Sequence, residues 1–446
     1  MLTRTERHQI RKGDPAYPAL DHLCFASKNL YNAGNYEIRQ RFFAAQAARA
    51  VVLEKNRTRP KSKKLKLPKP NYLGYFELDR MLRNHDAYLA LPAKVAQVTL
   101  RRLGESWTSW FKAIADYRKN PEKYEREPRI PGYLDKAEGR AVVTYTNQAV
   151  TKSKMDKTAF GDSQGEVVYP LHVSGITGAI TTTKLQHNQI NCVRLVPQRT
   201  RDVIVIEIVT EIEEVKTKLN RKLHAGVDVG LNVLAAVTSD KPGFQPVLVN
   251  GRPLKSINQF YNYKRAELYS KLPEPADENE TRSSARLRRL SRIRHDKIQD
   301  YMHKTSRAVV NLLVRERIGN LVIGKNDGWK TEINIGSRNN QNFVCVPHAR
   351  FVEMLTYKAE AAGIVVTLTE ESYTSRCSFL DLEPMEKREV YAGTRKKRGL
   401  FVSRVHGNIH ADVNGSYNTI RKVVPKAFRK GIEVVLVQPK QLLVAA

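Results

Sequence analysis

Acidic side chains at three places in the chain could do chemistry together. Asp228 lies in the stretch Gly226-Val-Asp-Val-Gly-Leu-Asn232, Glu370 and Glu371 follow an apolar run, and Asp412 lies near the start of a predicted helix. A carboxylate inside an apolar β-hairpin is costly unless a cation lies beside it. Asp228 is therefore predicted either to pair with a basic side chain or to hold a metal ion.

Acids gathered at one end of a sheet can hold two divalent cations about 4 Å apart. Such ions activate a water and stabilise the leaving oxygen in phosphodiester hydrolysis. Oxygen ligands and a phosphate substrate favour Mg²⁺, with Mn²⁺ as a substitute. The ordered set of Asp228, Glu370 or Glu371, and Asp412 thus predicts a two-metal nuclease site. The alternative for the two glutamates is that both are surface acids of a basic protein.

The charge of the chain indicates a polyanionic partner. Its 446 residues include 76 Lys and Arg against 45 Asp and Glu, a formal net charge of +31. Such a charge repels itself in the compact state and needs a polyanion to offset it. The basic residues lie along the whole chain, which predicts an extended nucleic-acid path. A ribosome-associated or merely sticky protein is the alternative.

Membrane insertion and secretion are not predicted. The chain has no run of 18 apolar residues and no apolar signal region at its N-terminus, so we expect a cytoplasmic, nucleoid-associated protein without membrane partners. The cysteines are far apart and form no CxxC pattern, which is typical of reduced, mostly buried thiols. They are Cys24, Cys192, Cys345 and Cys377.

Hydrophobic periodicity predicts a helical first part and a β-rich second part before residue 220. The expected elements are a strand over residues 1–10, a helical region from Leu20, a helix over 93–117, an extended Pro128-Arg-Ile-Pro131 linker, and strands from 140 to 210. The two-residue period of the last segment predicts a small barrel that the N-terminal strand completes.

Strands and helices alternate in the second half, which predicts an α/β sheet. The expected elements are a hairpin over residues 226–238, helices within 254–317, a strand over 320–324, a helix over 352–362, a strand over 363–369, an irregular basic segment over 372–410, and a last helix from residue 411.

Two motifs carry a family resemblance. Gly226-Val-Asp-Val-Gly-Leu-Asn232, followed by an Asp-x-Asn-x-x-x-Asn element of Asp412, Asn414 and Asn418, resembles the split RuvC nuclease of the TnpB family. These are transposon-encoded RNA-guided DNA endonucleases related to type V CRISPR effectors. The likeness extends to the Leu30-Tyr-Asn32 helix, the Pro128–Pro131 linker and Tyr373-Thr-Ser375.

The resemblance implies a multidomain α+β protein, with a helical recognition domain and a wedge β-barrel followed by a RuvC (ribonuclease H-like) α/β domain. It implies a guide RNA, CRISPR-like or of the transposon-encoded kind, and a double-stranded DNA target read by pairing plus a short flanking motif, in a monomer or homodimer. The implied ranges are 1–15 and 139–218 for the barrel, 16–138 for recognition, 219–371 and 411–446 for RuvC, and 372–410 for a degenerate zinc-ribbon-like insert that binds target nucleic acid.

The chain departs from the family in two ways. The family places its second catalytic acid after the strand that corresponds to residues 321–324, where this chain has no Glu and only Asp327 in a turn-like context. We expect the missing acid to have moved to the neighbouring strand, to whichever of Glu370 and Glu371 points inward. The family's zinc insert has two Cys pairs, whereas this one offers only Cys377, so no zinc is predicted.

These departures leave competing hypotheses. The first is an active, Mg²⁺-dependent RNA-guided DNA endonuclease, and the second is a nuclease-inactive RNA-guided DNA-binding repressor. A structure-specific nuclease without a guide would leave the basic N-terminal lobe unexplained. Seven side chains are expected to contact nucleic acid: Asn32, Arg282, Arg286, Arg289, Lys330, Arg376 and Lys396. The alternative is that they face solvent or pack within the protein.

Overall fold

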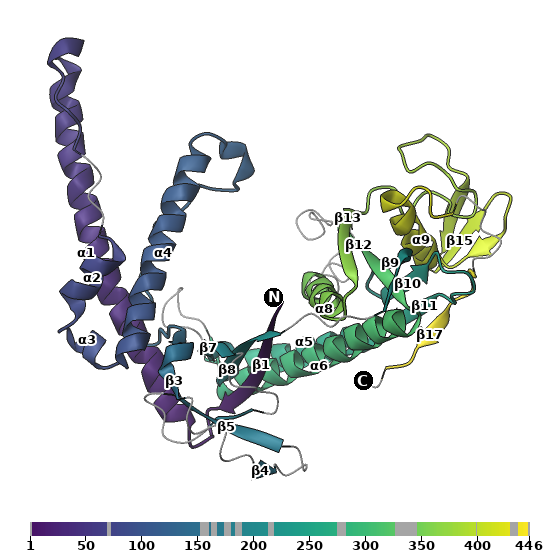
Figure 1. Cartoon of the computed structure of the whole chain (residues 1–446), viewed down its shortest axis with the longest axis horizontal. Helices are drawn as coiled ribbons and strands as arrows, with labels where there is room; N and C mark the ends of the chain where they lie inside the picture. The colour runs from purple at the N-terminus through teal and green to yellow at the C-terminus, as the bar shows by residue number, and fades with distance from the viewer. Residues whose placement is uncertain are drawn as a thin grey trace. The chain divides into compact units, whose positions relative to one another are not determined.

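The chain forms two compact units, residues 1–212 and 213–446, each treated by itself below. The predicted boundary at 218/219 falls close to this division, and the finer predicted ranges stay predictions. The computed structural model (Figure 1) describes residues 2–68, 73–151, 160–161, 167–173, 180–182, 190–212, 218–273, 282–325, 346–397, 399–428 and 436–444.

Helices build one half of the first unit. Their bounds are α1 Tyr17–Arg57, α2 Tyr75–Leu82, α3 Asp86–Leu89 and α4 Ala93–Tyr117. The last of these spans the predicted range, and Leu100, Leu103 and Trp107 on its apolar stripe are fully buried. Burial of such a stripe against α1 explains why this stretch is helical.

A stripe of polar side chains on α1 fixes the linker that follows α4. Residues at spacings of three and four share one helix face, and here that face holds the backbone of residues 131–136. The bonds are Lys28 Nζ to Lys136 O (2.6 Å), Asn32 Nδ2 to Leu134 O (2.8 Å), Asn35 Nδ2 to Pro131 O (3.0 Å) and Arg39 Nη1 to Pro131 O (2.9 Å).

The N-terminal strand joins a sheet with strands from nearly 200 residues later, as predicted. The strands are β1 Leu2–Arg11, β2 Val143–Thr146, β7 Ile190–Gln198 and β8 Val203–Ile212, in the order β1-β8-β7-β2. The pairing of β1 with β8 is antiparallel over its whole length. A second small sheet contains β3 Val150–Thr151, β4 Phe160–Gly161, β5 Val167–Val173 and β6 Ile180–Thr182. Closure of these strands into a wedge barrel stays a prediction.

A six-stranded sheet forms the frame of the second unit. Its strands are β9 Asn220–Val229, β10 Val233–Ser239, β11 Val247–Asn250, β12 Ile318–Lys325, β13 Val365–Glu370 and β17 Lys440–Leu442. The order is β13-β12-β9-β10-β11-β17. The first three strands along the chain form an antiparallel meander, and β12 and β13 then add parallel to β9. The predicted hairpin around Asp228 and the α/β character are both confirmed.

The two faces of this sheet carry different partners. Ala225, Val227 and Val229 on β9 belong to a core that also contains buried residues of α6 Ala285–Arg315 and α8 His348–Ala361. Because side chains alternate along a strand, Gly226 and Asp228 lie on the other face. There α9 Ala411–Val423 packs on β9 and β10. The fold therefore points Asp228 at α9.

The remaining elements of the second unit are α5 Arg252–Tyr269, which runs beside α6 (Figure 1), and a small sheet. Its strands are β14 Gly393–Lys397, β15 Leu400–Ser403 and β16 Asn408–Ile409. The prediction of an irregular segment over 372–410 is wrong in this part, because Phe401 and Ile409 bury apolar side chains in the core around α9.

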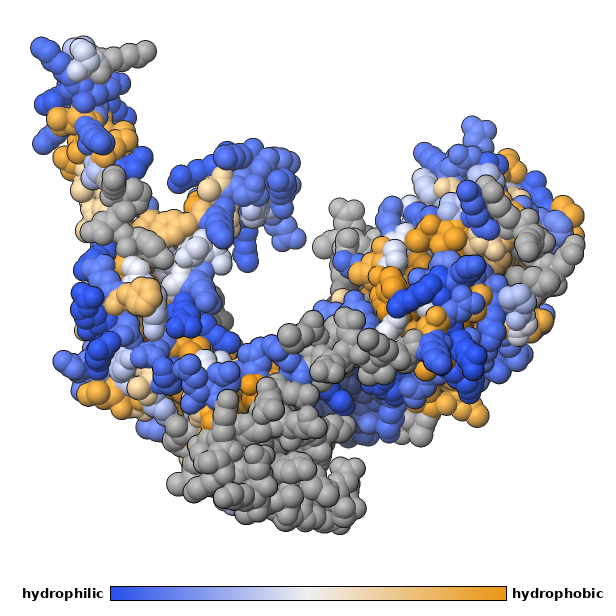
Figure 2. Space-filling view, viewed as in Figure 1, coloured by the Kyte–Doolittle hydropathy of each residue, from blue (hydrophilic) through white to orange (hydrophobic). Residues whose placement is uncertain are grey.

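Two further findings concern the surface and the thiols. No helix among the described residues is long and apolar enough to cross a membrane, and the visible face is mostly hydrophilic (Figure 2). Cys24 and Cys377 are buried free thiols and Cys192 is a partly buried one. Cys345 lies outside the described residues.

Candidate active site

Asp228 is held against the first turns of α9 by a contact between small residues. A Cβ atom built on Gly415 would lie 2.7 Å from Oδ2 of Asp228, and one built on Gly226 would lie 2.3 Å from the carbonyl oxygen of Ser416. The Ser416 hydroxyl donates to the carbonyl of Gly226 at 2.8 Å. Glycine at both positions therefore lets the helix approach the strand closely enough to leave the Asp228 side chain only partly exposed.

Asp412 reaches the same place from the start of α9. It lies three residues before Gly415, so both share the helix face that meets Asp228. The Asp412 backbone N–H is capped by Nδ1 of His410 at 3.3 Å. The guanidinium of Arg395 on β14 donates to Asp412 Oδ1 at 3.2 Å, and 45% of that Arg side chain is exposed.

Glu371 comes from the end of β13 and crosses over the neighbouring strand β12. The parallel register pairs Gly324 with Thr369, and a Cβ atom built on Gly324 would lie 2.5 Å from Oε1 of Glu371. That oxygen is buried and has no hydrogen-bond partner within the described part of the chain. A buried carboxylate oxygen without a partner is costly, so it is a natural place for a cation.

Glu370 and Glu371 point in different directions. The side chain of Glu370 is 73% exposed and lies 3.8 Å from Nζ of Lys422. Glu371 is instead only partly exposed, and it lies close enough to Asp228 for its negative charge to raise the pKa of Asp228. The expectation that only one of the pair points inward agrees with this geometry, which selects Glu371. The inclusion of Glu370 among the predicted metal ligands is not supported by its position, because its carboxylate faces solvent.

Burial and mutual repulsion dominate the electrostatics of this cluster. The pKa of Asp228 is raised well above its usual value, first by burial and then by the negative charges of Glu371 and Asp412, with Arg395 opposing the shift. Burial raises the pKa of Glu371 to about 7, and Lys422 opposes that shift. Like charges this close cannot all ionise without a nearby cation. The site is therefore built to bind positive charge.

The asparagines of the Asp-x-Asn-x-x-x-Asn motif hold the chain that follows Glu371. Asn414 Nδ2 donates to the carbonyl of Cys377 at 2.9 Å, and its Oδ1 accepts from the N–H of Phe379 at 2.8 Å. Asn418 Nδ2 donates to the carbonyls of Thr374 and Cys377 at 3.0 and 2.8 Å. All these groups are buried, so the motif ties α9 to the turn that carries the second acid.

The three acids approach one another but are not drawn together tightly. In the parts of the chain that the structure describes, no group of three His, Cys, Asp or Glu side chains is arranged to hold a metal ion as it stands. Arg395 occupies one oxygen of Asp412 instead.

The predicted nucleic-acid contacts fall into two groups. Asn32 and Arg282 are already used inside the protein, so their nearer role is structural: Asn32 bonds the backbone of Leu134 in both directions, and Arg282 donates to the carbonyl of Leu272 and stacks over Tyr269 at 4.7 Å. The side chains on the surface are Arg286 and Arg289 on α6, Arg376 after β13, and Lys396 on β14. Lys330 lies outside the described residues.

Two buried carboxylates tie the 372–410 insert together. Glu383 accepts from the backbone N–H groups of Ser378 and Ala392 at 2.8 and 2.9 Å. Asp381 accepts from the hydroxyl of Ser403 at 3.0 Å and lies 2.8 Å from Nδ1 of His406. These hydrogen bonds link separate parts of the insert without a metal ion. The absence of zinc stays a prediction.

Three residues of the site were not found by sequence reasoning. Arg395 was seen only as part of a basic run, and nothing in its spacing showed that it would meet Asp412. Gly324 and Gly415 make room for the two acids. The absence of a Glu after residues 321–324, where the family resemblance implies one, was the available signal that another acid is used.

Comparisons with known proteins cover most of the second unit. Residues 207–330 match the family model OrfB_IS605, a probable transposase, and residues 348–419 match the TNB domain of Cas12f1-like proteins. A search of curated proteins found no match.

Solved structures share an arrangement only loosely with this chain. A Cas12f1-sgRNA-target DNA complex is 9% identical, with a TM-score of 0.48, covering 91% of this chain and 82% of that one. The mini-RNA-guided endonuclease CRISPR-Cas_phi3 is 10% identical, with a TM-score of 0.46, covering 95% and 92%. C2c1 of Alicyclobacillus acidoterrestris with single-guide RNA is 10% identical, with a TM-score of 0.38, covering 91% and 69%. Scores at this level carry no conclusion about chemistry.

The two family models are the informative matches, because each contains one motif of the site. The stretch 207–330 includes Asp228, and the stretch 348–419 includes both Glu371 and Asp412. These two matches confirm the resemblance to the TnpB family that the motifs indicated.

Proposed function

We propose that this protein is an RNA-guided DNA endonuclease that hydrolyses phosphodiester bonds at a single RuvC-type site. The observation that carries the proposal is the convergence of Asp228, Glu371 and Asp412 at one end of the six-stranded sheet, with a buried oxygen on Glu371 that has no hydrogen-bond partner among the described residues. The probable-transposase and TNB-domain matches support nucleic acid as the partner. The guide RNA and the flanking motif follow from the family resemblance.

The donor set suits Mg²⁺ better than a softer metal. Asp228, Glu371 and Asp412 supply only carboxylate oxygens, and hard divalent cations prefer oxygen ligands. These three side chains would hold the ions, with Mn²⁺ as a substitute. Bound there, the ions would supply an activated water and stabilise the leaving oxygen of the cut strand. The raised pKa values of Asp228 and Glu371 indicate a local excess of negative charge that such ions would neutralise.

The protein's own groups orient the acids and the substrate strand. Asn414 and Asn418 fix the turn after Glu371, and Gly415 keeps α9 against Asp228. The half-exposed guanidinium of Arg395 lies beside Asp412. A charged hydrogen bond from Arg395 to a phosphate oxygen would place a strand over the three acids and stabilise negative charge as the bond breaks.

Cleavage of a supercoiled plasmid tests the proposal. Purified protein, a guide RNA matching the plasmid and Mg²⁺ should give cut DNA, and chelation of the metal should stop the reaction. Asp228→Ala and Asp412→Ala should each lower the rate on the order of 1,000-fold or more, because a metal ligand contributes several kcal/mol to the transition state. Target binding in the presence of chelator should stay close to the parental value.

A matched variant separates chemistry from general charge effects. Asp300 on α6 is a half-exposed acid paired with Lys304, so Asp300→Ala should cut normally. Loss of DNA binding in both site variants would show that their acids are structural. Target binding without any cleavage by the parental protein would favour the repressor, which the lack of a Glu after β12 keeps as the second candidate.

A further inference from the structure

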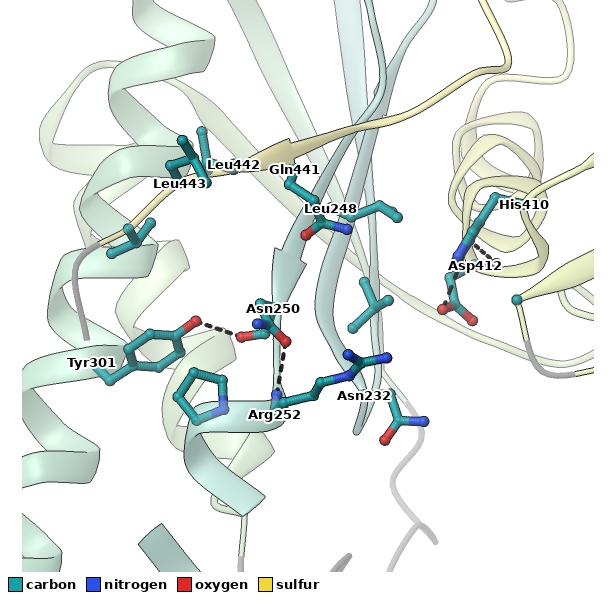
Figure 3. Close-up of a pocket in the computed structure, with 14 residues that line it drawn as sticks. Asn232, Leu248, Asn250, Arg252, Tyr301, His410, Asp412, Gln441, Leu442 and Leu443 are labelled. Atoms are coloured by element: carbon teal, nitrogen blue, oxygen red, sulfur yellow. Dashed lines mark hydrogen bonds and ion pairs between the residues drawn. The ribbon is translucent and has the colours of Figure 1, made fainter. Parts of the chain in front are cut away.

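A cavity of about 710 Å³ opens directly beside Asp412 (Figure 3). It lies between the turn after β9, the strands β10, β11 and β17, the start of α5 and the start of α9. Ligand pockets for small organic molecules span about 300–1,000 Å³, so this one has the capacity for a single nucleotide.

The walls of the cavity combine apolar surface with amide groups. Val233, Leu248 and Leu442 supply the apolar part, and Asn232 and Gln441 supply amides. Figure 3 shows the Gln441 amide beside Leu248. Lys255 Nζ donates to Oδ1 of Asn232 at 3.0 Å, which orients that amide. Apolar walls with a few placed hydrogen-bonding groups suit a planar heterocycle with polar edges.

One cation of the lining is available for a ligand. Arg252 is exposed at the start of α5, and its backbone N–H is bonded to Oδ1 of Asn250 at 3.0 Å. Among the described residues, no hydrogen bond or ion pair engages its guanidinium group. Figure 3 shows that group extending toward Asn232, on the side of the cavity that faces Asp412. A guanidinium placed so is a good donor to a phosphate.

We propose that this cavity binds one nucleotide of the cleaved DNA strand, next to the phosphate that would be hydrolysed beside the three acids. The base lies against Leu248 and Leu442, the amide of Gln441 meets its edge, and Arg252 holds its phosphate. This assignment rests on the proposed nuclease function for the position of the strand. A peptide occupant is disfavoured because the lining offers a cation and amides in a chain of net charge +31.

A short fluorescent oligonucleotide tests the cavity without requiring cleavage. The probe is the trinucleotide d(T-2-aminopurine-T), titrated into the metal-free protein at low salt, where phosphate contacts are strongest. Parental protein should give a saturable fluorescence change. Gln441→Trp fills the cavity from an exposed strand, and Arg252→Ala removes the cation, so each should weaken binding about tenfold or more. Lys440→Trp places the same ring on the neighbouring residue, which does not line the cavity, and should bind normally.

The outcomes separate this inference from the proposed function. Equal binding by parental protein, Gln441→Trp and Arg252→Ala, or a signal that never saturates, overturns the cavity assignment even if plasmid DNA is cut. Weaker trinucleotide binding by Gln441→Trp and Arg252→Ala, but not by Lys440→Trp, supports the cavity assignment even if no plasmid DNA is cut. In that case only the nuclease proposal is wrong. Circular dichroism melting of all variants shows whether any loss reflects unfolding.

Discussion

The side chain of Glu371 occupies the space that a side chain on Gly324 would need. A Cβ atom at Gly324 would lie 2.5 Å from Oε1 and 2.7 Å from Cγ of Glu371, and real Cβ atoms do not come that close. The two residues come from adjacent parallel strands. An acid can therefore reach this point from β12 or from β13, but not from both.

Placing the acid at position 324 instead of position 371 should preserve cleavage. Gly324→Glu alone should lower cleavage strongly, because two side chains compete for one space. The double variant Gly324→Glu with Glu371→Ala should recover a substantial part of the parental rate, since a carboxylate on β12 would enter the space that Glu371 leaves. Single-turnover cleavage with saturating guide and target measures this.

The single variants give the comparison for that exchange. Glu371→Ala should be inactive, and Gly324→Ala should lose both rate and stability because Glu371 must shift. If the double variant is no better than Glu371→Ala, the idea that the acid changed strands is wrong.

Glutamine substitutions should separate the two neighbouring glutamates. Glu371→Gln keeps the shape but removes the buried charge, so cleavage should fall on the order of 100-fold or more, as for other groups that stabilise the transition state electrostatically. Glu370→Gln should stay within about twofold, since its side chain is 73% exposed. Rates are measured at saturating Mg²⁺ and target. A larger loss for Glu370→Gln would reverse the assignment.

A buried lysine should make stability depend on pH. Lys358 on α8 donates to the carbonyl of His303 at 2.8 Å and to Ser306 Oγ at 2.7 Å, and burial lowers its pKa from 10.5 to about 8. Below pH 8 the residue is charged in both states and its burial is penalised fully. Between pH 8 and 10.5 the unfolded state binds more protons, so stability rises with pH. The gain amounts to about 3 kcal/mol at most.

Lys358→Met should abolish that rise. Urea unfolding at pH 7.5 and pH 10 gives the free energy of unfolding of the parental and variant proteins at each pH. Comparing the two proteins removes the contribution of the other titrating groups. Lys304→Met serves as the control because Lys304 is exposed on α6 and pairs with Asp300. A parental pH dependence that survives in Lys358→Met would show that this amine is not the group responsible.

The 372–410 insert should fold without zinc. Glu383→Ala leaves two buried N–H groups without acceptors, which costs about 2–4 kcal/mol, and should speed hydrogen exchange in this segment. Glu386→Ala removes a 61% exposed side chain and should change little. Elemental analysis of the purified protein checks the metal directly. About one zinc per chain, or a drop in melting temperature on chelation, would contradict the expectation.

The sequence was sufficient for the elements that obey a simple period. The helix over 93–117, the hairpin around Asp228 and the alternation of strands and helices after it were predicted because burial of one face imposes that period. Which of Glu370 and Glu371 points inward could not be predicted, since the strand before them is apolar on both faces. The ordered small sheet of the insert was missed because polar side chains, notably Asp381 and Glu383, do part of its cross-linking.

The site itself shows the same limit. Asp228 and Asp412 stand in recognisable motifs, whereas the contact between Arg395 and Asp412 depends on how β14 lies beside α9. No local pattern encodes a contact of that kind. The roles of Asn414 and Asn418 were likewise visible as a motif, but only their bonds to the Cys377 turn show what they do.

The order in which the chain supplies its acids would make the proposed nuclease divisible into two pieces. Asp228 and Glu371 precede the turn at Val405, which is 77% exposed, and Asp412 follows it. A cut at that turn leaves two pieces joined by noncovalent contacts, among them the pairing of β15 with β16, the hydrogen bonds of Asn414 and the stack of Phe379 on Tyr417 at 4.3 Å. Neither piece alone holds a complete set of acids. If each piece were fused to one partner of an inducible dimer, DNA cleavage would require the dimer to form and bring the two pieces together.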